Sequence, residues 1–166
     1  MTTDARNTTN IIFYGIGGQG VLKASEACSV AALFQGFRVK KTEIHGMSQR
    51  GGSVESSVRF GKVVISPLIS KGQADFIICL HPEEYKNPQG LLRDGGMDLI
   101  AYTHKAYEVL ADNKIFVNSF LLGVLSGYLE ISEDNWVKAL KAVFGEKRQK
   151  ENLTFFKEGR TWAKRL

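Results

Sequence analysis

The amino-acid sequence predicts one α/β domain: a Rossmann-like, three-layer fold with a mostly parallel sheet, an antiparallel hairpin and helices at its C-terminal end. Three observations predict this class. Short runs of strand-forming residues recur in the first half, a glycine-rich loop joins the first of them to a helical segment, and apolar residues recur at helical spacing from residue 118 onward. No repeat, linker or low-complexity tract interrupts residues 1–166, which we expect to form a single domain with residues 1–9 disordered.

The first part of the chain predicts a strand, a tight loop, a helix and a second strand. Residues 11–14 are an apolar run that ends at the glycine cluster of residues 15–20. Residues 21–35 then present the small side chains of a closely packed helix, which ends before Gly36. Residues 37–40 alternate apolar and basic and predict the second strand. Because the interval between the strands fits a right-handed crossover, we expect them to run parallel.

An antiparallel hairpin and a central strand are predicted next. Residues 54–60 form a strand with one apolar face, and Gly61-Lys62 suits a two-residue turn of type II′ into a strand over residues 63–65. Residues 74–80 are apolar enough for a central parallel strand that is buried on both faces. Pro82 suits the first turn of a helix that follows this strand.

The remaining segments predict one more strand and a helical end. We expect a strand over residues 97–102, after a turn at residues 94–96. Apolar residues at helical spacing over residues 118–129 predict a helix, and Ser132 is a suitable N-cap for the next one. A last helix is predicted over residues 153–162.

Composition excludes several classes of protein. Cys28 and Cys79 lie far apart without any C-x-x-C pairing, so we expect no metal site in this chain. No apolar run is long enough to cross a membrane, and the polar start lacks the layout of a secretion signal, so we expect a cytoplasmic protein with no membrane association. Two buried, free thiols are the expected state of the cysteines.

The net charge of +5 is concentrated at the C-terminal end, where residues 137–166 hold nine Lys and Arg against three Asp and Glu. A nucleic-acid surface would interleave such charges with aromatic residues, whereas this region has the pattern of amphipathic helices, so we expect no nucleic-acid binding. A surface for an acidic partner or ligand stays open as an alternative.

The glycine loop offers backbone N–H groups and the positive end of a helix dipole to an anion. Gly15, Gly17 and Gly20 have the G-x-G-x-x-G spacing of dinucleotide sites. Such a site needs an acidic residue at the end of the second strand, and residues 38–41 read Arg-Val-Lys-Lys instead. NADP binding and a purely structural turn both stay open at this point.

A second polar loop, residues 43–52, should emerge beside the glycine loop at the carboxyl edge of the sheet. Here the sequence resembles the gamma subunits and domains of the pyruvate, ketoisovalerate, 2-oxoglutarate and indolepyruvate ferredoxin oxidoreductases. The family motifs G-x-G-G-Q-G and E-x-H-G-M-[SA]-Q-R-G-G are similar to residues 15–20 and 43–52. Further resemblance covers residues 53–61, 66–69, 74–75, 118–123 and 152–156, whereas residues 80–114 are shorter than the family pattern.

The resemblance implies an accessory, gamma-type subunit that is inactive alone. Enzymes of this family cleave a 2-oxoacid with thiamine diphosphate and Mg²⁺, pass electrons through [4Fe-4S] clusters to ferredoxin and release an acyl-CoA. The chain has neither a thiamine-site G-D-G motif nor a cysteine cluster, so these cofactors are expected on partner subunits, with CoA on or shared with them. Ferredoxin would then be an indirect partner.

The residues expected to line a ligand or partner cleft come from both loops and from the start of the C-terminal helices. They are Gly15, Gly17, Gly18, Gln19, Gly20, Glu43, His45, Gly46, Ser48, Gln49, Arg50, Gly51, Gly52 and Asn118. His45 and Arg50 are the candidates for a direct catalytic role, through proton exchange and anion binding. A stand-alone NAD(P)-binding oxidoreductase, an independent binding module and a homodimer remain alternatives.

Overall fold

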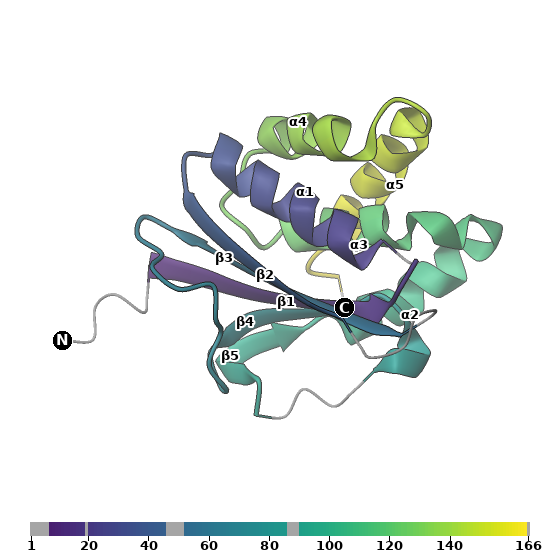
Figure 1. Cartoon of the computed structure of the whole chain (residues 1–166). Coiled ribbons are helices and arrows are strands. Elements are labelled where there is room, and N and C mark those ends of the chain that lie inside the picture. The colour runs from purple at the N-terminus through teal and green to yellow at the C-terminus, as the bar shows by residue number, and fades with distance from the viewer. Residues whose placement is uncertain (1–6, 19, 46–51, 86–89, 166) are drawn as a thin grey trace.

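The computed structural model describes residues 7–18, 20–45, 52–85 and 90–165. Five strands form one mixed sheet in the order β2-β3-β1-β4-β5 (Figure 1). Their bounds are β1 Thr8–Ile16, β2 Arg38–His45, β3 Ser53–Gly61, β4 Ala74–Cys79 and β5 Leu92–Asp98. β3 runs antiparallel to β1 and β2, while β4 is parallel to β1 and β5, so four of the five strands point the same way.

The N-terminal end of the sheet differs from the expectation for residues 1–9. β1 begins at Thr8, because Thr8 and Thr9 pair with Gly61 and Phe60 of β3. Two of the residues that we expected to be disordered are therefore part of a strand. Residues 1–6 lie outside the described residues.

The antiparallel hairpin is formed by β2 and β3, and the prediction that residues 63–65 pair with β3 is wrong. Both edges of β3 are already occupied, by β1 and by β2. The Arg59 guanidinium holds the segment after β3 in place, because it donates to the carbonyl oxygens of Ser66 and Leu68 at 2.8 and 2.9 Å. β1 and β2 run parallel as predicted, but β3 lies between them.

The helices are α1 Val21–Phe34, α2 Ile100–Val109, α3 Val117–Ser126, α4 Glu133–Phe144 and α5 Gln149–Trp162, with short 3-10 turns at Pro82–Glu84 and Ala111–Phe116. The helix expected after Pro82 is only the first of these turns. The strand expected over residues 97–102 is wrong beyond Asp98, because the Asp98 carboxylate accepts from the Ile100 N–H at 3.0 Å and α2 begins there. β5 instead starts at Leu92 and passes through the predicted turn with an irregularity in register.

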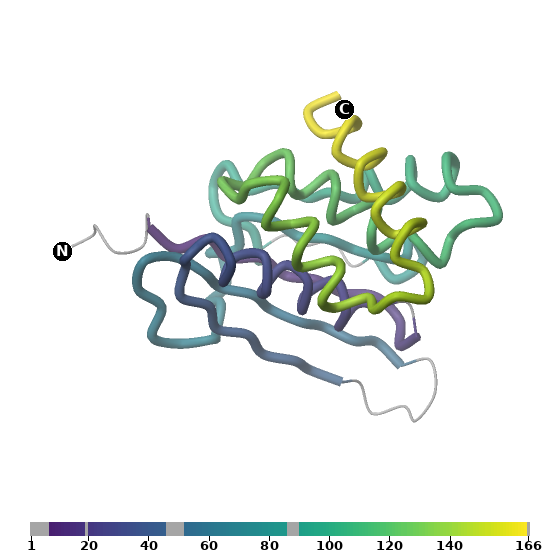
Figure 2. The backbone as a smooth tube through the Cα atoms, turned by 90° about the horizontal axis from the view of Figure 1, so that it is seen from above, coloured from purple at the N-terminus to yellow at the C-terminus, as the bar shows by residue number. Residues whose placement is uncertain are grey.

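α1, α3, α4 and α5 cover one face of the sheet (Figures 1 and 2). Ile11, Phe13 and Ile78 point to that side and belong to the main core, which also includes the buried residues of α2. The opposite face has a small cluster of Ile12, Ala74 and Ile77, packed against Ile69 and Leu92. Where a third layer was expected, the described chain therefore places the segment after β3 rather than a helix.

α3 and α5 cross in direct backbone contact. A Cβ at Gly159 would lie 1.9 Å from the Phe120 carbonyl oxygen, and a Cβ at Gly123 would lie 2.0 Å from that of Phe156. Only glycine permits so close an approach. This crossing fixes the beginning of α3 next to the beginning of α5, which positions the site described below.

Candidate functional site

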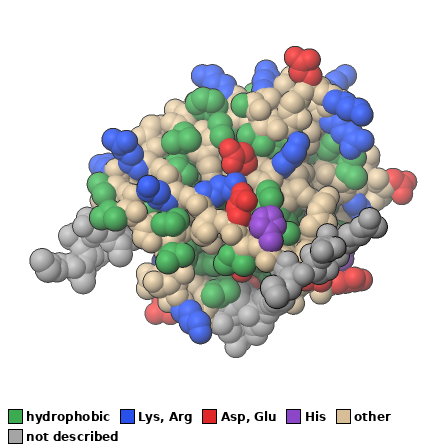
Figure 3. Space-filling model, viewed as in Figure 1, with side chains coloured by type: hydrophobic (Ala, Val, Ile, Leu, Met, Phe, Trp, Pro, Cys, Tyr) green, Lys and Arg blue, Asp and Glu red, His purple; other side chains and the backbone are tan. Residues whose placement is uncertain are grey.

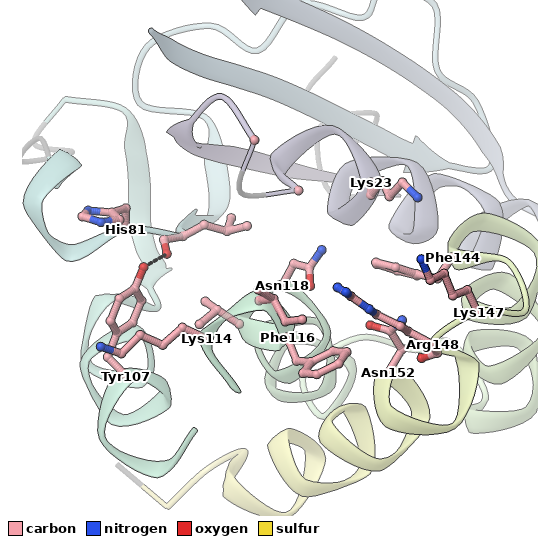
Figure 4. A pocket seen from close by; sticks show the side chains of 15 residues that line it. Lys23, His81, Tyr107, Lys114, Phe116, Asn118, Phe144, Lys147, Arg148 and Asn152 are labelled. Atoms are coloured by element: carbon pink, nitrogen blue, oxygen red, sulfur yellow. Dashed lines mark hydrogen bonds between the residues drawn. The ribbon is translucent and has the colours of Figure 1, made fainter. Parts of the chain in front are cut away.

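A cleft of about 880 Å³ opens where β1 and β4 end (Figure 4). The glycine loop after β1 contributes Gly18 and Gly20, and the chain after β4 contributes Leu80 and His81. β1 and β4 are parallel neighbours at the middle of the sheet, with β2 to one side of them and β5 to the other, and such a reversal of strand order is where open α/β sheets bind ligands. The fold thus puts a ligand-sized hollow at the carboxyl edge of the sheet.

Three helices begin at this cleft. α1 contributes its N-cap Gly20, α3 its N-cap Phe116 together with Asn118, and α5 its N-cap Arg148 together with Asn152. None of these three helices has a hydrogen bond from the side chain of its N-cap residue, and α1 and α3 have no acidic residue in the first turn. Each start leaves backbone N–H groups without an intrahelical acceptor and has a partial positive charge.

The charged side chains at the cleft are all basic. Lys23, Lys114, Lys147 and Arg148 line it, and no Asp or Glu is among the described residues that do so. None of the four takes part in the ion pairs formed within the described part of the chain. Lys23 lies 5.8 Å from the ring centre of Phe144 and Lys114 lies 5.6 Å from that of Tyr107. The cleft is therefore suited to an anion.

Asn118 supplies a directed donor at the floor of the cleft. Its side chain is buried, at 5% exposure, and its Oδ1 accepts from the Ser119 N–H at 2.8 Å. The amide nitrogen has no partner among the described residues and points toward the glycine loop (Figure 4). Gly20 allows this contact, because a Cβ there would lie 2.4 Å from that nitrogen.

Asn152 joins the starts of α3 and α5. Its Oδ1 accepts from the Ser119 hydroxyl at 2.6 Å, and its amide nitrogen donates to the Arg148 carbonyl at 2.8 Å. Both side-chain groups of Asn152 are thus satisfied. Asn118 is left as the buried amide at the cleft with a donor to spare.

His81 directly precedes the 3-10 turn Pro82–Glu84 and lines the cleft. Its Nδ1 accepts from the Glu83 N–H at 3.2 Å, and its ring meets that of Tyr107 edge-on at 5.7 Å. The Tyr107 hydroxyl donates to the Leu80 carbonyl at 3.3 Å, which fixes this end of the cleft.

The second loop ends beside the glycine loop, as predicted, but it begins at the end of β2, which β3 separates from β1. The Gly17 N–H donates to the Gly52 carbonyl at 2.9 Å. Val54 of β3 pairs with Gly15 of β1 on one side and with His45 of β2 on the other. Two polar segments that are far apart in sequence are thereby held at one edge.

Glu43 and His45 lie at the end of β2 and do not line the cleft. The Glu43 carboxylate pairs with Lys41 at 2.7 Å and lies 3.7 Å from His45, while Lys41 also binds Glu26 at 2.9 Å. The hydrogen bond from Lys41 holds the pKa of the Glu43 carboxyl below its usual value. On the face seen in Figure 3, acidic and basic side chains sit together among hydrophobic ones, and the Glu26–Lys41–Glu43 group is a mixed network of this kind.

The comparison with protein families matches residues 10–162 to the model of pyruvate ferredoxin/flavodoxin oxidoreductase. The chain belongs to this family. The curated relatives include the indolepyruvate oxidoreductase subunit IorB of Thermococcus kodakarensis, 43% identical over 88 residues, which are 53% of this chain and 44% of that protein. The same subunit of Archaeoglobus fulgidus is 51% identical over 75 residues, which are 45% of this chain and 37% of that protein. The match thus spans less than half the length of these relatives.

Solved structures of the family share the fold. The gamma subunit of the keto/oxoacid ferredoxin oxidoreductase of Geobacter sulfurreducens superposes with a TM-score of 0.74 at 23% identity, covering 95% of this chain and 99% of that one. The 2-oxoglutarate:ferredoxin oxidoreductase of Magnetococcus marinus gives 0.75 at 20% identity, covering 96% of this chain and 32% of that one. This family fold therefore extends over nearly the whole chain.

The structure brings some of the predicted site residues of this family member together and leaves others apart. Gly18, Gly20 and Asn118 line the cleft, Gly15, Gly17 and Gly52 lie beside it, and Glu43 and His45 face elsewhere. The others lie outside the described residues, namely Gln19, Gly46, Ser48, Gln49, Arg50 and Gly51. The catalytic roles considered for His45 and Arg50 stay predictions.

Sequence reasoning missed the cleft residues that come from the helical half and from α1, namely Lys23, Lys114, Lys147, Arg148 and Asn152. The one signal for them was the basic excess of residues 137–166, which includes Lys147 and Arg148. Among the described residues no group of three or more His, Cys, Asp and Glu is placed to hold a metal ion. Within the same part of the chain, none of the helices has the length and apolar character to cross a bilayer.

Proposed function

We propose that this chain is the gamma-type accessory subunit of a thiamine-diphosphate-dependent 2-oxoacid:ferredoxin oxidoreductase. In the complex, a 2-oxoacid is oxidatively decarboxylated to an acyl-CoA on a partner catalytic subunit. The observation that carries the proposal is the family match over residues 10–162, and the similarity to a gamma subunit over nearly its whole length supports it. The complex acts in the cytoplasm.

The electron-transfer clusters belong on a partner chain. Cys28 and Cys79 are buried, and burial raises the pKa of both thiols, whereas cluster ligands are thiolates that converge on one point. The residues present do not fit a [4Fe-4S] cluster. Thiamine diphosphate and Mg²⁺ belong on the catalytic partner as well, CoA is held there or shared with this chain, and ferredoxin meets the complex through the iron–sulfur subunit.

The edge of the sheet with the two loops is the surface that faces the catalytic partner. The bond between Gly17 and Gly52 joins the loops at that edge, next to the basic cleft. A partner docked there would close the cleft from one side and exclude water from the ligands that both chains share. This chain then contributes positive charge and directed N–H donors rather than a reacting group.

The topology argues against the alternative of a stand-alone dinucleotide enzyme. A ribose-binding acid belongs at the end of a second parallel strand next to β1, and here the neighbour is the antiparallel β3. Glu43 on β2 is also engaged by Lys41. Among the described residues, the glycine loop therefore has no acidic side chain in the position that NAD binding requires.

The test is reconstitution with the thiamine-bearing subunit. We expect the two chains to co-elute in size-exclusion chromatography, and viologen dye to be reduced in the presence of a 2-oxoacid and CoA only by the mixture. Indolepyruvate is the first substrate to assay, because the curated relatives are named as indolepyruvate oxidoreductase subunits. Full activity of the catalytic subunit alone, or NADPH-dependent reduction of a carbonyl by the isolated chain, would contradict the proposal.

A loop variant tests whether the docking edge matters. Arg50→Ala is expected to assemble and to lose activity, because it removes a cation from the loop at that edge. The matched control is Arg38→Ala, which removes an exposed arginine at the opposite end of β2. If both variants keep full activity, Arg50 has no role in the reaction.

A further inference from the structure

We propose that the outer edge of β2 is an interface at which two copies of this chain pair antiparallel, with Thr42 on the two-fold axis between them. The two five-stranded sheets would join there into one continuous sheet. The proposal goes beyond the proposed function and does not depend on it, because it rests on the geometry and the charges of this chain alone.

β2 is the end strand of the sheet and runs along the outside of the molecule (Figure 2). Its residues, Arg38–His45, pair with β3 on one side and include no proline. Among the strands that the structure describes, none pairs with its other side. An open edge of this length presents a row of unpaired N–H and C=O groups, which is a template for another strand.

The backbone groups on the open side belong to alternate residues of β2. The Thr42 carbonyl faces β3, because it accepts from the Ser56 hydroxyl of that strand at 3.2 Å. Successive residues of a strand direct their N–H and C=O groups to opposite sides. Val39, Lys41 and Glu43 therefore present theirs outward, where a second strand can bond to them.

The side chains of these three residues lie on the helical side of the sheet. Val39 packs against the main core, and Lys41 bonds to Glu26 of α1 at 2.9 Å and to Glu43 at 2.7 Å. Two residues directly opposite in an antiparallel pair point to the same face. When two β2 strands pair, Lys41 of one copy therefore lies opposite Lys41, Glu43 or another residue of this face in the other copy.

Charge selects one register from this set. With Lys41 on the two-fold axis, two ammonium groups would lie directly opposite each other, and with Glu43 on the axis two carboxylates would meet. With Thr42 on the axis, each Lys41 lies opposite the Glu43 of the other copy. Opposite charges at such positions stabilise a sheet and like charges destabilise it. The same register pairs Val39 with His45 and so uses nearly the whole strand.

The features that usually protect an edge strand are weak in β2. Lysine on an edge discourages pairing, but Lys41 is neutralised by its two carboxylate partners, and only 19% of its side chain is exposed. On the opposite face, Ile44 is 60% exposed and would lie across from Lys40 of the other copy, whose aliphatic stem can cover it. Pairing therefore removes apolar surface from water as well as satisfying backbone groups.

The helical side of this edge leaves room for the second copy. A recess of about 490 Å³ lies between α1, α4 and β2. Leu22, Val30 and Val143 line it together with Lys41 and Glu43. Because Lys41 and Glu43 lie next to the axis, the recesses of the two copies face each other across it. This space accommodates the paired side chains.

An extended segment of a partner subunit is the other occupant that an open edge could accept. The second copy is favoured because the edge is complementary to itself: one register satisfies both the backbone geometry and the charge pattern. We therefore assign the edge to a second copy and make the partner segment an outcome of the test.

The experiment measures the mass of the full chain by size-exclusion chromatography with light scattering over a concentration series. A contact through one strand edge is small and belongs with transient interfaces. We therefore expect the mass to rise from 18.4 kDa toward twice that value as the concentration increases. A chain that stays monomeric at every concentration overturns the proposal.

Hydrogen exchange of the same samples locates the contact. The outward amides of Lys41 and Glu43 should exchange about tenfold more slowly in the dimer, because they become bonded to the second copy. The Thr42 amide, which faces β3, is the internal reference and should not change. A dimer that leaves the two outward amides unprotected joins through another surface and refutes the assignment.

Charge reversals test the register. Lys41→Glu places a carboxylate opposite that of Glu43, and Glu43→Lys places an ammonium group opposite that of Lys41, so each variant alone should stay a monomer. An equimolar mixture of the two should form a heterodimer, because every pair across the axis is again of opposite charge. Lys157→Glu, an exposed position on α5, is the control and should dimerise like the unaltered chain. If both variants have native circular dichroism but their mixture stays monomeric, the register is refuted.

The complex with the thiamine-bearing subunit distinguishes the two occupants. If the edge joins two copies, the complex contains this chain in pairs, and the amides of Lys41 and Glu43 are protected in the isolated dimer as well. If those amides become protected only when the thiamine-bearing subunit is added, the edge accepts a partner segment and the proposal fails, while the subunit role stands.

Discussion

The contact between Gly20 and Asn118 gives a prediction with a measurable magnitude. Gly20 has a φ of 80°, and a Cβ there would lie 2.4 Å from the Asn118 amide nitrogen. In a Gly20→Ala variant this nitrogen must retreat by about 1 Å to reach the 3.4 Å of an ordinary contact. Such a shift weakens the bond that the Asn118 oxygen accepts from the Ser119 N–H, which is buried.

The expected cost has two parts. Alanine at a positive φ costs about 1–2 kcal/mol, and leaving a buried N–H unsatisfied costs a further ~1–3 kcal/mol. Gly36→Ala is the matched control, because Gly36 has a φ of 94° at the other end of α1 and nothing within 4 Å of its Cβ position. We therefore expect Gly20→Ala to be less stable than Gly36→Ala by ~1–3 kcal/mol.

The assay is a double-mutant cycle with Asn118→Ala, using free energies of unfolding from urea titrations followed by circular dichroism. Asn118 Cβ lies 3.8 Å from the Cβ position of Gly20, so the clash disappears once the amide is removed. Gly20→Ala should then cost no more than Gly36→Ala. A coupling energy below ~0.5 kcal/mol, the usual limit of additivity, would refute the proposed contact between the glycine loop and Asn118.

Three further predictions concern titration and reactivity. The hydrogen bond to Asp98 raises the pKa of Tyr85 from 10.0 to about 12, so the stabilisation from this bond is complete below pH 10.0 and is lost as pH rises through 12. Tyr85→Phe should remove a phenolate step near pH 12 from an absorbance titration. Lys41 lowers the pKa of the Glu43 carboxyl below 4.5. The stabilisation from this pair is therefore present above pH 4.5 and is lost as pH falls. Glu43→Gln should flatten the acid side of a curve of unfolding free energy against pH. Burial raises the pKa of the Cys28 thiol, so it should react with a thiol reagent only after unfolding, and fast labelling of the native chain would contradict this.

Elements with local signals were predicted well from the sequence. The first helix was expected over residues 21–35 and extends over Val21–Phe34, and Ser132 caps α4 by accepting from the Asn135 N–H. Residues 74–80 were expected to be a central parallel strand, and β4 covers Ala74–Cys79 between β1 and β5. A glycine stop, a capping hydroxyl and a long apolar run all act within a few residues.

The errors arose where distant pairing decides the structure. Residues 63–65 have the composition of a strand, but β3 has no free edge to pair with them, and the sequence alone does not show that β2 occupies it. Residues 97–102 are a short apolar run that suits a strand or a helix equally, and β5 ends at Asp98, whose carboxylate accepts from the Ile100 N–H where α2 begins.

The candidate site follows the same division. Gly18, Gly20 and Asn118 were selected from the sequence, and the structure places all three at the cleft. Lys114 and Arg148 were not, because nothing local brings a turn before α3 and the start of α5 to the glycine loop. The close crossing of α3 and α5 at Gly123 and Gly159 does so, through tertiary packing that no short motif encodes.

The position of β3 explains how a dinucleotide-like glycine loop can serve another ligand. In a dinucleotide site the neighbouring parallel strand presents its acidic residue to the ribose, but here β2 is two strands from β1, about 10 Å away. The space beside the loop opens instead toward the chain after β4 and the starts of α3 and α5, where basic side chains, two amides and helix ends line it. A cleft with these groups, and with no carboxylate among the described residues that line it, discriminates by charge and favours an anion over the neutral hydroxyls of a sugar.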